Sequence, residues 1–220
     1  MCSLLPICKP LLCYVTDRRG FGDAAEAQEK LLLARIEQAA KAGVDWIQLR
    51  EKDLSGKQLA GLAREAARVA RGASAILIND RMDVACAVQA AGVHLGEHSL
   101  PVREATRFVQ EGRAGRDFLV GASVHSLEAA QKAEQEGANY VIFGPVYATP
   151  SKAAFGPPQG LESLRQVCGA LTIPVLAVGG ITLENARDCL EAGANGIAAI
   201  RLFQEANDLP ALVRRLRSGV

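Results

Sequence analysis

A short phrase, in which glycine is followed by a small apolar residue and then a polar one, recurs four times along this chain. Its copies occupy residues 42–45, 91–94, 136–139 and 192–195, about fifty residues apart. Each copy follows an alanine-rich stretch of helical character and precedes a short apolar run. Glycine just past a helix end tolerates a left-handed cap, and a short apolar run after it is typical of a buried strand. The repeat therefore predicts alternating helices and strands, with a second strand between successive copies.

Further apolar runs supply the strands that this repeat requires. We expect strands at residues 11–16, 45–50, 75–79, 92–95, 118–122, 140–143, 174–178 and 196–200. Helical patterns separate them, and we expect one over 24–42, one ending near Ala90 and one from Ser126 to Glu136. Ser55 and Gln58 match a capping box, and Ser126 is a favoured N-cap. Eight buried strands alternating with helices predict one closed parallel (β/α)8 TIM barrel over residues 1–220. An open doubly wound sheet is the alternative.

Composition and charge narrow the class of function. The 220 residues carry a formal net charge of +1, so no large basic surface for nucleic acid is expected. The apolar runs are too short to span a membrane, and the first residues lack a secretory pattern. Six cysteines without a CxxC pair are typical of reduced packing residues, which favours the cytoplasm. Small molecules are the expected partners.

Polar residues follow the predicted strands, at the end of such a barrel where active sites lie. Gln48, Arg50 and Lys52 alternate onto one side of the second strand's end, and an amide with two cations suits a diphosphate. A solvated loop with Glu51 paired to Lys52 is the alternative.

The third and fifth strands end in further candidates. The Asp80 carboxylate after Asn79 suits Mg²⁺ held together with substrate phosphates, unless Asp80 caps the next helix. Ser123 and His125 follow the fifth strand, where either can bond substrate and His125 can move protons. His94 falls inside a buried strand, so we expect it to line the barrel rather than bind a ligand.

The segment after the sixth strand combines two hydroxyls and a cation, Thr149, Ser151 and Lys152, in a constrained loop. Such a loop fits a lid that closes over a phosphate. Gly179-Gly180 after the seventh strand lets backbone N–H groups approach a phosphate closely. Arg201, at the end of the eighth strand, either reinforces that anion site or closes a surface salt bridge.

Six motifs together resemble the thiamine phosphate synthase family over nearly the whole chain. They are residues 48–52, 79–80, 92–96, 123–125, 144–152 and 178–181. The resemblance implies a barrel enzyme that joins hydroxymethylpyrimidine diphosphate to a thiazole phosphate and releases diphosphate, using Mg²⁺. It also implies a homodimer.

The same resemblance implies a role for each candidate. It places at the pyrimidine diphosphate the residues Gln48, Arg50, Lys52, Asn79, Ser123 and Lys152. It places at the thiazole phosphate Thr149, Ser151, Gly180, Ile200 and Arg201, the last two through their backbone. Asp80 would hold Mg²⁺. The expected catalytic group comprises Arg50, Lys52, Ser123, His125 and Lys152.

Two positions depart from the family pattern. Family synthases carry a second metal-binding Asp in a Gly-Gln-x-Asp stretch, where this chain has Gly96-Glu97-His98-Ser99. Ser99 therefore stands at the Asp position, and Glu97 is a neighbouring carboxylate. The family also has Ser where this chain has Arg201. Two alternatives stay open: a related thiazole tautomerase that would use His125, and a barrel that binds thiamine-pathway phosphates without turnover.

Overall fold

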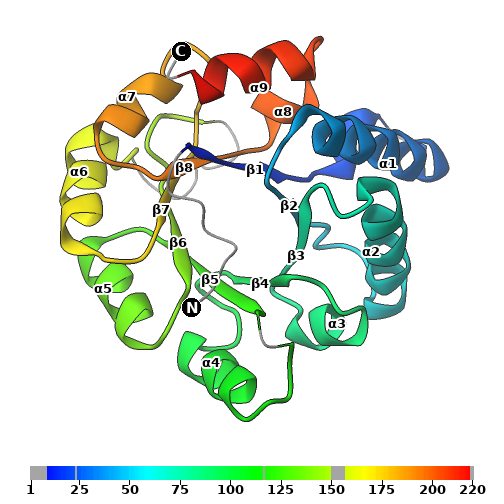
Figure 1. The fold of residues 1–220 in the computed structure, drawn as a ribbon, viewed down its shortest axis with the longest axis horizontal. Helices are drawn as coiled ribbons and strands as arrows, with labels where there is room; N and C mark the ends of the chain where they lie inside the picture. The colour runs from blue at the N-terminus through cyan, green and yellow to red at the C-terminus, as the bar shows by residue number, and fades with distance from the viewer. Residues whose placement is uncertain (1–8, 23, 116, 150–156, 219–220) are drawn as a thin grey trace.

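The computed structural model describes residues 9–22, 24–115, 117–149 and 157–218, and shows eight parallel strands closed into a barrel (Figure 1). The strands are β1 (Leu11–Val15), β2 (Trp46–Leu49), β3 (Ala75–Asn79), β4 (Gly92–Leu95), β5 (Leu119–Val124), β6 (Tyr140–Phe143), β7 (Val175–Val178) and β8 (Gly196–Ala199). Because β1 pairs with β8 as well as β2, the sheet is closed. The predicted barrel is confirmed, and the open-sheet alternative is wrong.

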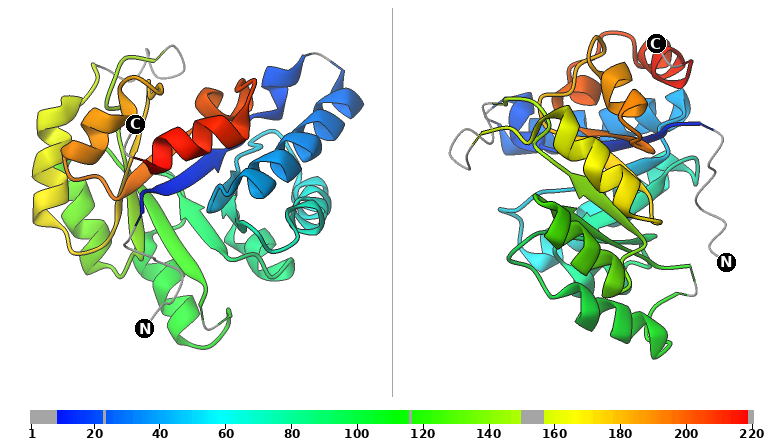
Figure 2. Two further views of the ribbon diagram at one scale, coloured as in Figure 1. Left: turned by 45° about the horizontal axis from the view of Figure 1, so that its top comes forward. Right: turned by 90° about the vertical axis from the view of Figure 1, so that its left-hand side faces the viewer.

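Helices surround the barrel in a single outer layer (Figure 1). They are the 3₁₀ helix η1 (Arg18–Phe21) and α1 (Ala25–Ala42), α2 (Gly56–Ala70), α3 (Met82–Ala87), α4 (Val102–Gln110), α5 (Leu127–Gln135), α6 (Gly160–Ala170), α7 (Ala186–Glu191), α8 (Arg201–Gln204) and α9 (Leu209–Arg217). The capping box of Ser55 and Gln58 forms as predicted, and Ser126 caps α5. The final helix α9 packs beside α1, which joins the last unit to the first (Figure 2).

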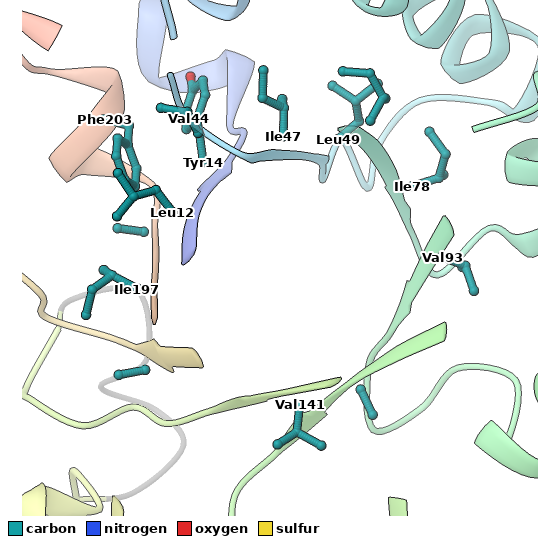
Figure 3. Close-up of a cluster of buried hydrophobic side chains, with 14 of the residues drawn as sticks. Leu12, Tyr14, Val44, Ile47, Leu49, Ile78, Val93, Val141, Ile197 and Phe203 are labelled. Atoms are coloured by element: carbon teal, nitrogen blue, oxygen red, sulfur yellow. The ribbon is translucent and has the colours of Figure 1, made fainter. Parts of the chain in front are cut away.

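The larger hydrophobic core fills the space between the strands and the helices. Leu12, Ile47, Ile78 and Val93 belong to this layer and extend outward from their strands (Figure 3). Successive side chains of a strand point to opposite faces, so the residues between these point into the barrel. Because side chains alternate along a strand, each apolar run contributes some residues to the core between strands and helices and others to the interior of the barrel.

The barrel interior changes character along its axis. Near the amino ends of the strands it is apolar, with Trp46 and Leu77 in the inner core. Two residues further along the same strands come Gln48 and Asn79, both buried. Because residues two apart share a face, these polar groups also point inward. The interior is therefore sealed by apolar groups below and lined by polar groups at the carboxyl end.

Three copies of the glycine phrase end helices as predicted. Gly43, Gly137 and Gly193 have positive φ angles of 92°, 92° and 102°. The prediction is wrong for the second copy, because Gly92 lies inside β4. There the left-handed residue is Gln89, with φ 54°, three positions earlier. Gly92 serves a different purpose, since a Cβ atom there would lie 2.3 Å from the Leu119 carbonyl oxygen of the adjacent strand.

The last residue of the other three copies anchors the neighbouring strand. Its side-chain oxygen accepts a hydrogen bond from a backbone N–H at that strand's amino end. The pairs are Leu12–Asp45, Val120–Asn139 and Val175–Asn195, at 2.8, 2.7 and 2.9 Å. The repeat is therefore a structural device of the amino end of the barrel.

Several element boundaries differ from the expected ones. β5 runs to Val124 rather than residue 122, which places Ser123 inside the strand, on the inward face. α3 stops at Ala87 instead of Ala90, and Arg201 begins the short helix α8. The described cysteines, Cys13, Cys86, Cys168 and Cys189, are unpaired and at least partly buried. Within the described ranges, no helix is long and apolar enough to cross a membrane.

Candidate active site

The carboxyl end of the barrel gathers polar side chains from neighbouring strands. Gln48 of β2 is 2% exposed, and its Nε2 has no hydrogen-bond partner among the residues that the structure describes. A buried donor left unpaired costs roughly 1–3 kcal/mol, so such groups in native proteins call for an explanation. A ligand that accepts a hydrogen bond at this point would supply one.

Arg50 and Lys52 follow β2, which ends at Leu49. The Arg50 guanidinium forms no ion pair within the described part of the chain, while its backbone N–H donates to Thr16 Oγ1 at 3.1 Å. Lys52 Nζ lies 3.9 Å from Asp80 Oδ2. The alternative in which Lys52 pairs with Glu51 is wrong, because the buried Glu51 side chain points toward β1. Two cations therefore stand at the rim, one unpaired and one in a long ion pair.

Glu51 belongs to a network that fixes the rim between β1 and β2. Its carboxylate accepts from Thr16 Oγ1 at 2.5 Å and from Arg18 Nη1 at 3.2 Å. Arg18 also donates to both carboxylate oxygens of Asp53 at 2.7 Å, which lowers the pKa of Asp53 to about 2. Thr16 receives the Arg50 N–H as well, so the network holds the backbone that carries Arg50 and Lys52.

Asp80 is held by groups from two strands. Its backbone has φ 62°, and its Oδ1 accepts from Gly96 N–H at 3.0 Å and from the Ser99 hydroxyl. Asn79 Nδ2 donates to Oδ2 at 2.6 Å. Burial acts to raise the pKa of Asp80, but the bonds from Ser99 and Gly96, with Lys52 and Asn79, outweigh it and lower that pKa. The helix-capping alternative is wrong: the residue preceding α3 is Arg81, without a side-chain cap.

His94 lines the barrel, as predicted. Its Nε2 lies 2.8 Å from Ser123 Oγ, and its Nδ1 lies 3.2 Å from the Tyr140 hydroxyl. Burial lowers the pKa of His94 to about 4, Asp80 opposes this shift and the Arg50 charge adds to it. The imidazole is therefore neutral near pH 7. Sequence reasoning missed the Tyr140 contact, because the two residues are 46 positions apart.

His125 lies beyond the carboxyl end of β5. Its Nδ1 donates to the Gly144 carbonyl oxygen, at the start of the segment that follows β6. A neutral imidazole carries one proton, so this bond leaves Nε2 as an acceptor. His125 thus tethers the start of this segment and keeps one basic nitrogen.

That segment packs against the turn after β7. Tyr147 N–H donates to the Gly179 carbonyl at 3.0 Å, and Gly180 has φ 64°. A Cβ atom on Gly180 would lie 2.6 Å from the Ala148 carbonyl oxygen. Glycine is therefore required here by packing as well as by conformation.

The same segment brings Thr149 close to Arg201, the first residue of α8. Arg201 Nη2 lies 3.4 Å from Thr149 Oγ1 and has no ion pair among the described residues, which contradicts the surface salt-bridge alternative. Ile200 immediately precedes α8. Ser151 and Lys152 lie outside the described residues.

The comparisons with known proteins agree on one family. Its model, described as thiamine monophosphate synthase, matches residues 12–203. The thiamine-phosphate synthase of Methanoculleus marisnigri is 44% identical over 86% of this chain and 86% of that protein. That of Roseiflexus sp. RS-1 is 37% identical over 96% and 85%. The solved thiamine phosphate pyrophosphorylase of Pyrococcus furiosus has a TM-score of 0.80 at 32% identity, covering 97% of this chain and 96% of that one.

This chain belongs to the thiamine monophosphate synthase family. The matched segment of this family member contains every candidate site residue, from Gln48 to Arg201. A separate cleft of about 530 Å³ lies at the opposite end of the barrel, lined mainly by apolar residues, with Asp45, Ser74 and Gln89 among its polar groups. Asp45 is already bound to Leu12 N–H and Arg217. Asp45 is therefore part of the hydrogen bonding that holds the amino end together.

Proposed function

We propose that this chain is a transferase of thiamine biosynthesis, which joins hydroxymethylpyrimidine diphosphate to a thiazole phosphate. The products are thiamine phosphate and diphosphate. Membership of the family supports this function, and the unpaired Nε2 of Gln48 is the observation that carries it. A buried amide donor at the bottom of a cationic mouth matches a substrate with a ring nitrogen acceptor and a diphosphate above it.

Bond breaking develops negative charge on the leaving diphosphate, close to the cationic rim residues. The carbon–oxygen bond to diphosphate breaks with both electrons leaving on oxygen, and the aminopyrimidine stabilises the cation that remains. The thiazole nitrogen then donates its electron pair to that carbon. Arg50, Lys52 and Lys152 offset the charge that grows on the leaving diphosphate, and Ser123 donates a hydrogen bond to it. No protein nucleophile is required.

The donor set at Asp80 fits a Mg²⁺ site that substrate completes. Mg²⁺ takes oxygen ligands and is commonly held by one or two carboxylates together with substrate phosphates and water. Asp80 supplies a carboxylate and Ser99 a hydroxyl, while Glu97 is exposed. Among the described residues, no group of three or more acidic, His or Cys side chains could hold a metal alone. When bound, Mg²⁺ would neutralise diphosphate charge.

The thiazole phosphate belongs on the other side of the mouth. Thr149 and Ser151 would bond it, with Gly180 and the backbone of Ile200 and Arg201 beneath. The bond between Arg201 and Thr149 supports this grouping, because it joins both sides of the suggested cradle. We place the protein in the cytoplasm as a homodimer, acting on small phosphorylated molecules rather than on nucleic acid or membranes.

The test supplies both substrates and measures released diphosphate, with Mg²⁺ and with a chelator. We expect Mg²⁺-dependent release, and a loss of roughly tenfold in kcat/KM for Gln48→Leu because one hydrogen bond to substrate disappears. Gln131→Leu, on the exposed face of α5, is the matched control and should retain full activity.

The other outcomes separate the remaining functions. Binding of both substrates without release would overturn the synthase and indicate a phosphate-binding barrel. Metal-independent isomerisation of a thiazole carboxylate, abolished by His125→Ala, would indicate the tautomerase instead. The Nε2 of His125, left as an acceptor by the bond from Nδ1 to Gly144, is the group on which that second activity would depend.

A further inference from the structure

A chain of three hydrogen-bonding side chains runs from the sealed interior of the barrel to its mouth. Tyr140 of β6 is fully buried, His94 of β4 lies above it, and Ser123 of β5 lies beyond His94. The His94 and Tyr140 rings are stacked, with centroids 5.6 Å apart. The proposed function uses Ser123 alone, so the two residues behind it have no assigned role.

The position of Tyr140 is fixed from two sides. Trp46 packs against it with ring centroids 4.6 Å apart. Gly121 leaves the space that the ring occupies, since a Cβ atom there would lie 2.0 Å from the Tyr140 ring. A hydroxyl held this firmly has one neighbour with which to bond: within the described residues its partner is His94 Nδ1.

The Tyr140–His94–Ser123 hydrogen bonds can form with two arrangements of their hydrogen atoms. In the first, Tyr140 donates to Nδ1, the Nε2–H of His94 donates to Ser123 Oγ, and the Ser123 hydrogen is left for a ligand. In the second, Nδ1–H donates to Tyr140, Ser123 donates to Nε2, and the Tyr140 hydrogen has no acceptor. A fully buried donor without an acceptor is disfavoured, so the first arrangement prevails.

The first arrangement also suits an anion. The Ser123 hydroxyl then presents a hydrogen to the mouth, whereas the second would present lone pairs to a negatively charged diphosphate. His94 is 2% exposed and both its ring nitrogens face hydroxyl groups, so a neutral imidazole with one N–H has these two arrangements available.

We propose that His94 is a positioning residue, held by Tyr140 as the Nε2–H tautomer, which turns the Ser123 hydroxyl hydrogen toward the bound diphosphate. The identity of the ligand rests on the proposed function. The tautomer rests on the contacts of Tyr140, His94 and Ser123, and is independent of it.

The tautomer is tested directly by nitrogen NMR on the full chain labelled in its three histidines, near pH 7. Two-bond nitrogen–proton spectra separate protonated from unprotonated ring nitrogens. The signal lost in His94→Gln identifies His94, and we expect its Nε2 to carry the proton. A proton on Nδ1 would overturn the proposal, whether or not the protein is a synthase.

A double-mutant cycle tests whether His94 acts through Ser123. His94→Leu and Ser123→Ala should each lower kcat/KM by roughly 10- to 150-fold, the value of a hydrogen bond to a charged group. The double variant should resemble Ser123→Ala within about twofold. Losses that multiply would show that His94 acts independently of Ser123 and would overturn the proposal.

A conservative variant guards against a merely structural effect. His94→Gln keeps an amide donor near the place of Nε2, so it should retain more activity than His94→Leu even where both lower thermal stability equally. If the wild-type protein releases no diphosphate, the same cycle is run on the binding of inorganic diphosphate by calorimetry. This measurement distinguishes an incorrect synthase function from an incorrect assignment of the His94 tautomer.

Discussion

The two ends of this barrel differ in the hydrogen bonding of their buried polar side chains. At the amino end, the side chains of Asp45, Asn139 and Asn195 bond to strand backbones, and Ser74 Oγ donates to the Val44 carbonyl at 2.6 Å. At the carboxyl end, Gln48 Nε2 is buried without a partner among the described residues. The bonded side chains at the amino end stabilise the fold, whereas the Gln48 Nε2 is a donor that a bound ligand would satisfy.

Two arginines make the same contrast. Arg217, at the amino end, donates to the Pro10 and Gly43 carbonyls and to Asp45 Oδ2, the last at 2.6 Å. Arg50, at the carboxyl end, forms no side-chain hydrogen bond or ion pair with any described residue. Arg217 therefore holds segments of the fold together, whereas the Arg50 guanidinium has no such structural partner among the described residues.

The largest expected effect comes from replacing each of these arginines with glutamine: one variant should lose activity and the other stability. Arg50→Gln removes a cation that meets the leaving diphosphate, so we expect kcat/KM to fall roughly 10²- to 10³-fold. Its melting temperature should stay near the wild-type value, because the side chain makes no hydrogen bond or ion pair with any described residue. Diphosphate release and thermal unfolding measure the two quantities.

Arg217→Gln is the matched opposite. It should lower the free energy of unfolding by about 1–3 kcal/mol and leave kcat/KM unchanged, because its bonds hold chain segments together. If instead Arg50→Gln unfolds at a lower temperature while Arg217→Gln loses activity, the contrast between the two ends is wrong.

Substitutions of Asp45, the last residue of the first glycine phrase, test whether its hydrogen bonds stabilise the amino end. Asp45→Ala removes the acceptor of Leu12 N–H and the partner of Arg217, and should cost about 1–3 kcal/mol of unfolding free energy. Asp45→Asn should cost less, since Asn139 and Asn195 make the equivalent bond with an amide. Urea unfolding measures both variants, and equal losses would show that the strand anchor contributes nothing.

The sequence predicted the elements of this fold because its periodic signals are local. The closed eight-stranded barrel and the caps at Ser55 and Ser126 form as expected. The glycine phrase failed at Gly92, where the same letters serve close strand packing and Gln89 adopts the left-handed turn. One glycine can thus answer two physical demands that a sequence pattern does not distinguish.

The connections between strand ends could not be predicted in the same way. The Glu51–Arg18 bond joins positions 33 residues apart, and His94 meets Ser123 across 29. Such partners are set by barrel register, so the sequence offered only nearer ones as alternatives, such as Lys52 for Glu51 and a helix cap for Asp80. The roles of the candidate site residues stay predictions, and Ser151 and Lys152 lie outside the described residues.

The rim network shows that some groups at the carboxyl end are structural, and its pH dependence gives the smallest expected effect. Asp53 is bound bidentately by Arg18, and its pKa is lowered to about 2 from an ordinary 3.8. A lowered folded-state pKa means that the stabilisation is complete above about pH 4 and is lost as pH falls toward 2. Because the Asp53 side chain is 46% exposed, we expect less than about 1 kcal/mol.

Asp53→Asn should therefore unfold slightly more easily than wild type at pH 6, and this difference should shrink when the urea titrations are repeated at pH 4 and pH 3. Glu29→Gln, exposed on α1, is the control and should show no difference at any of these values. A difference that grows as pH falls would mean that Arg18 does not stabilise the Asp53 carboxylate.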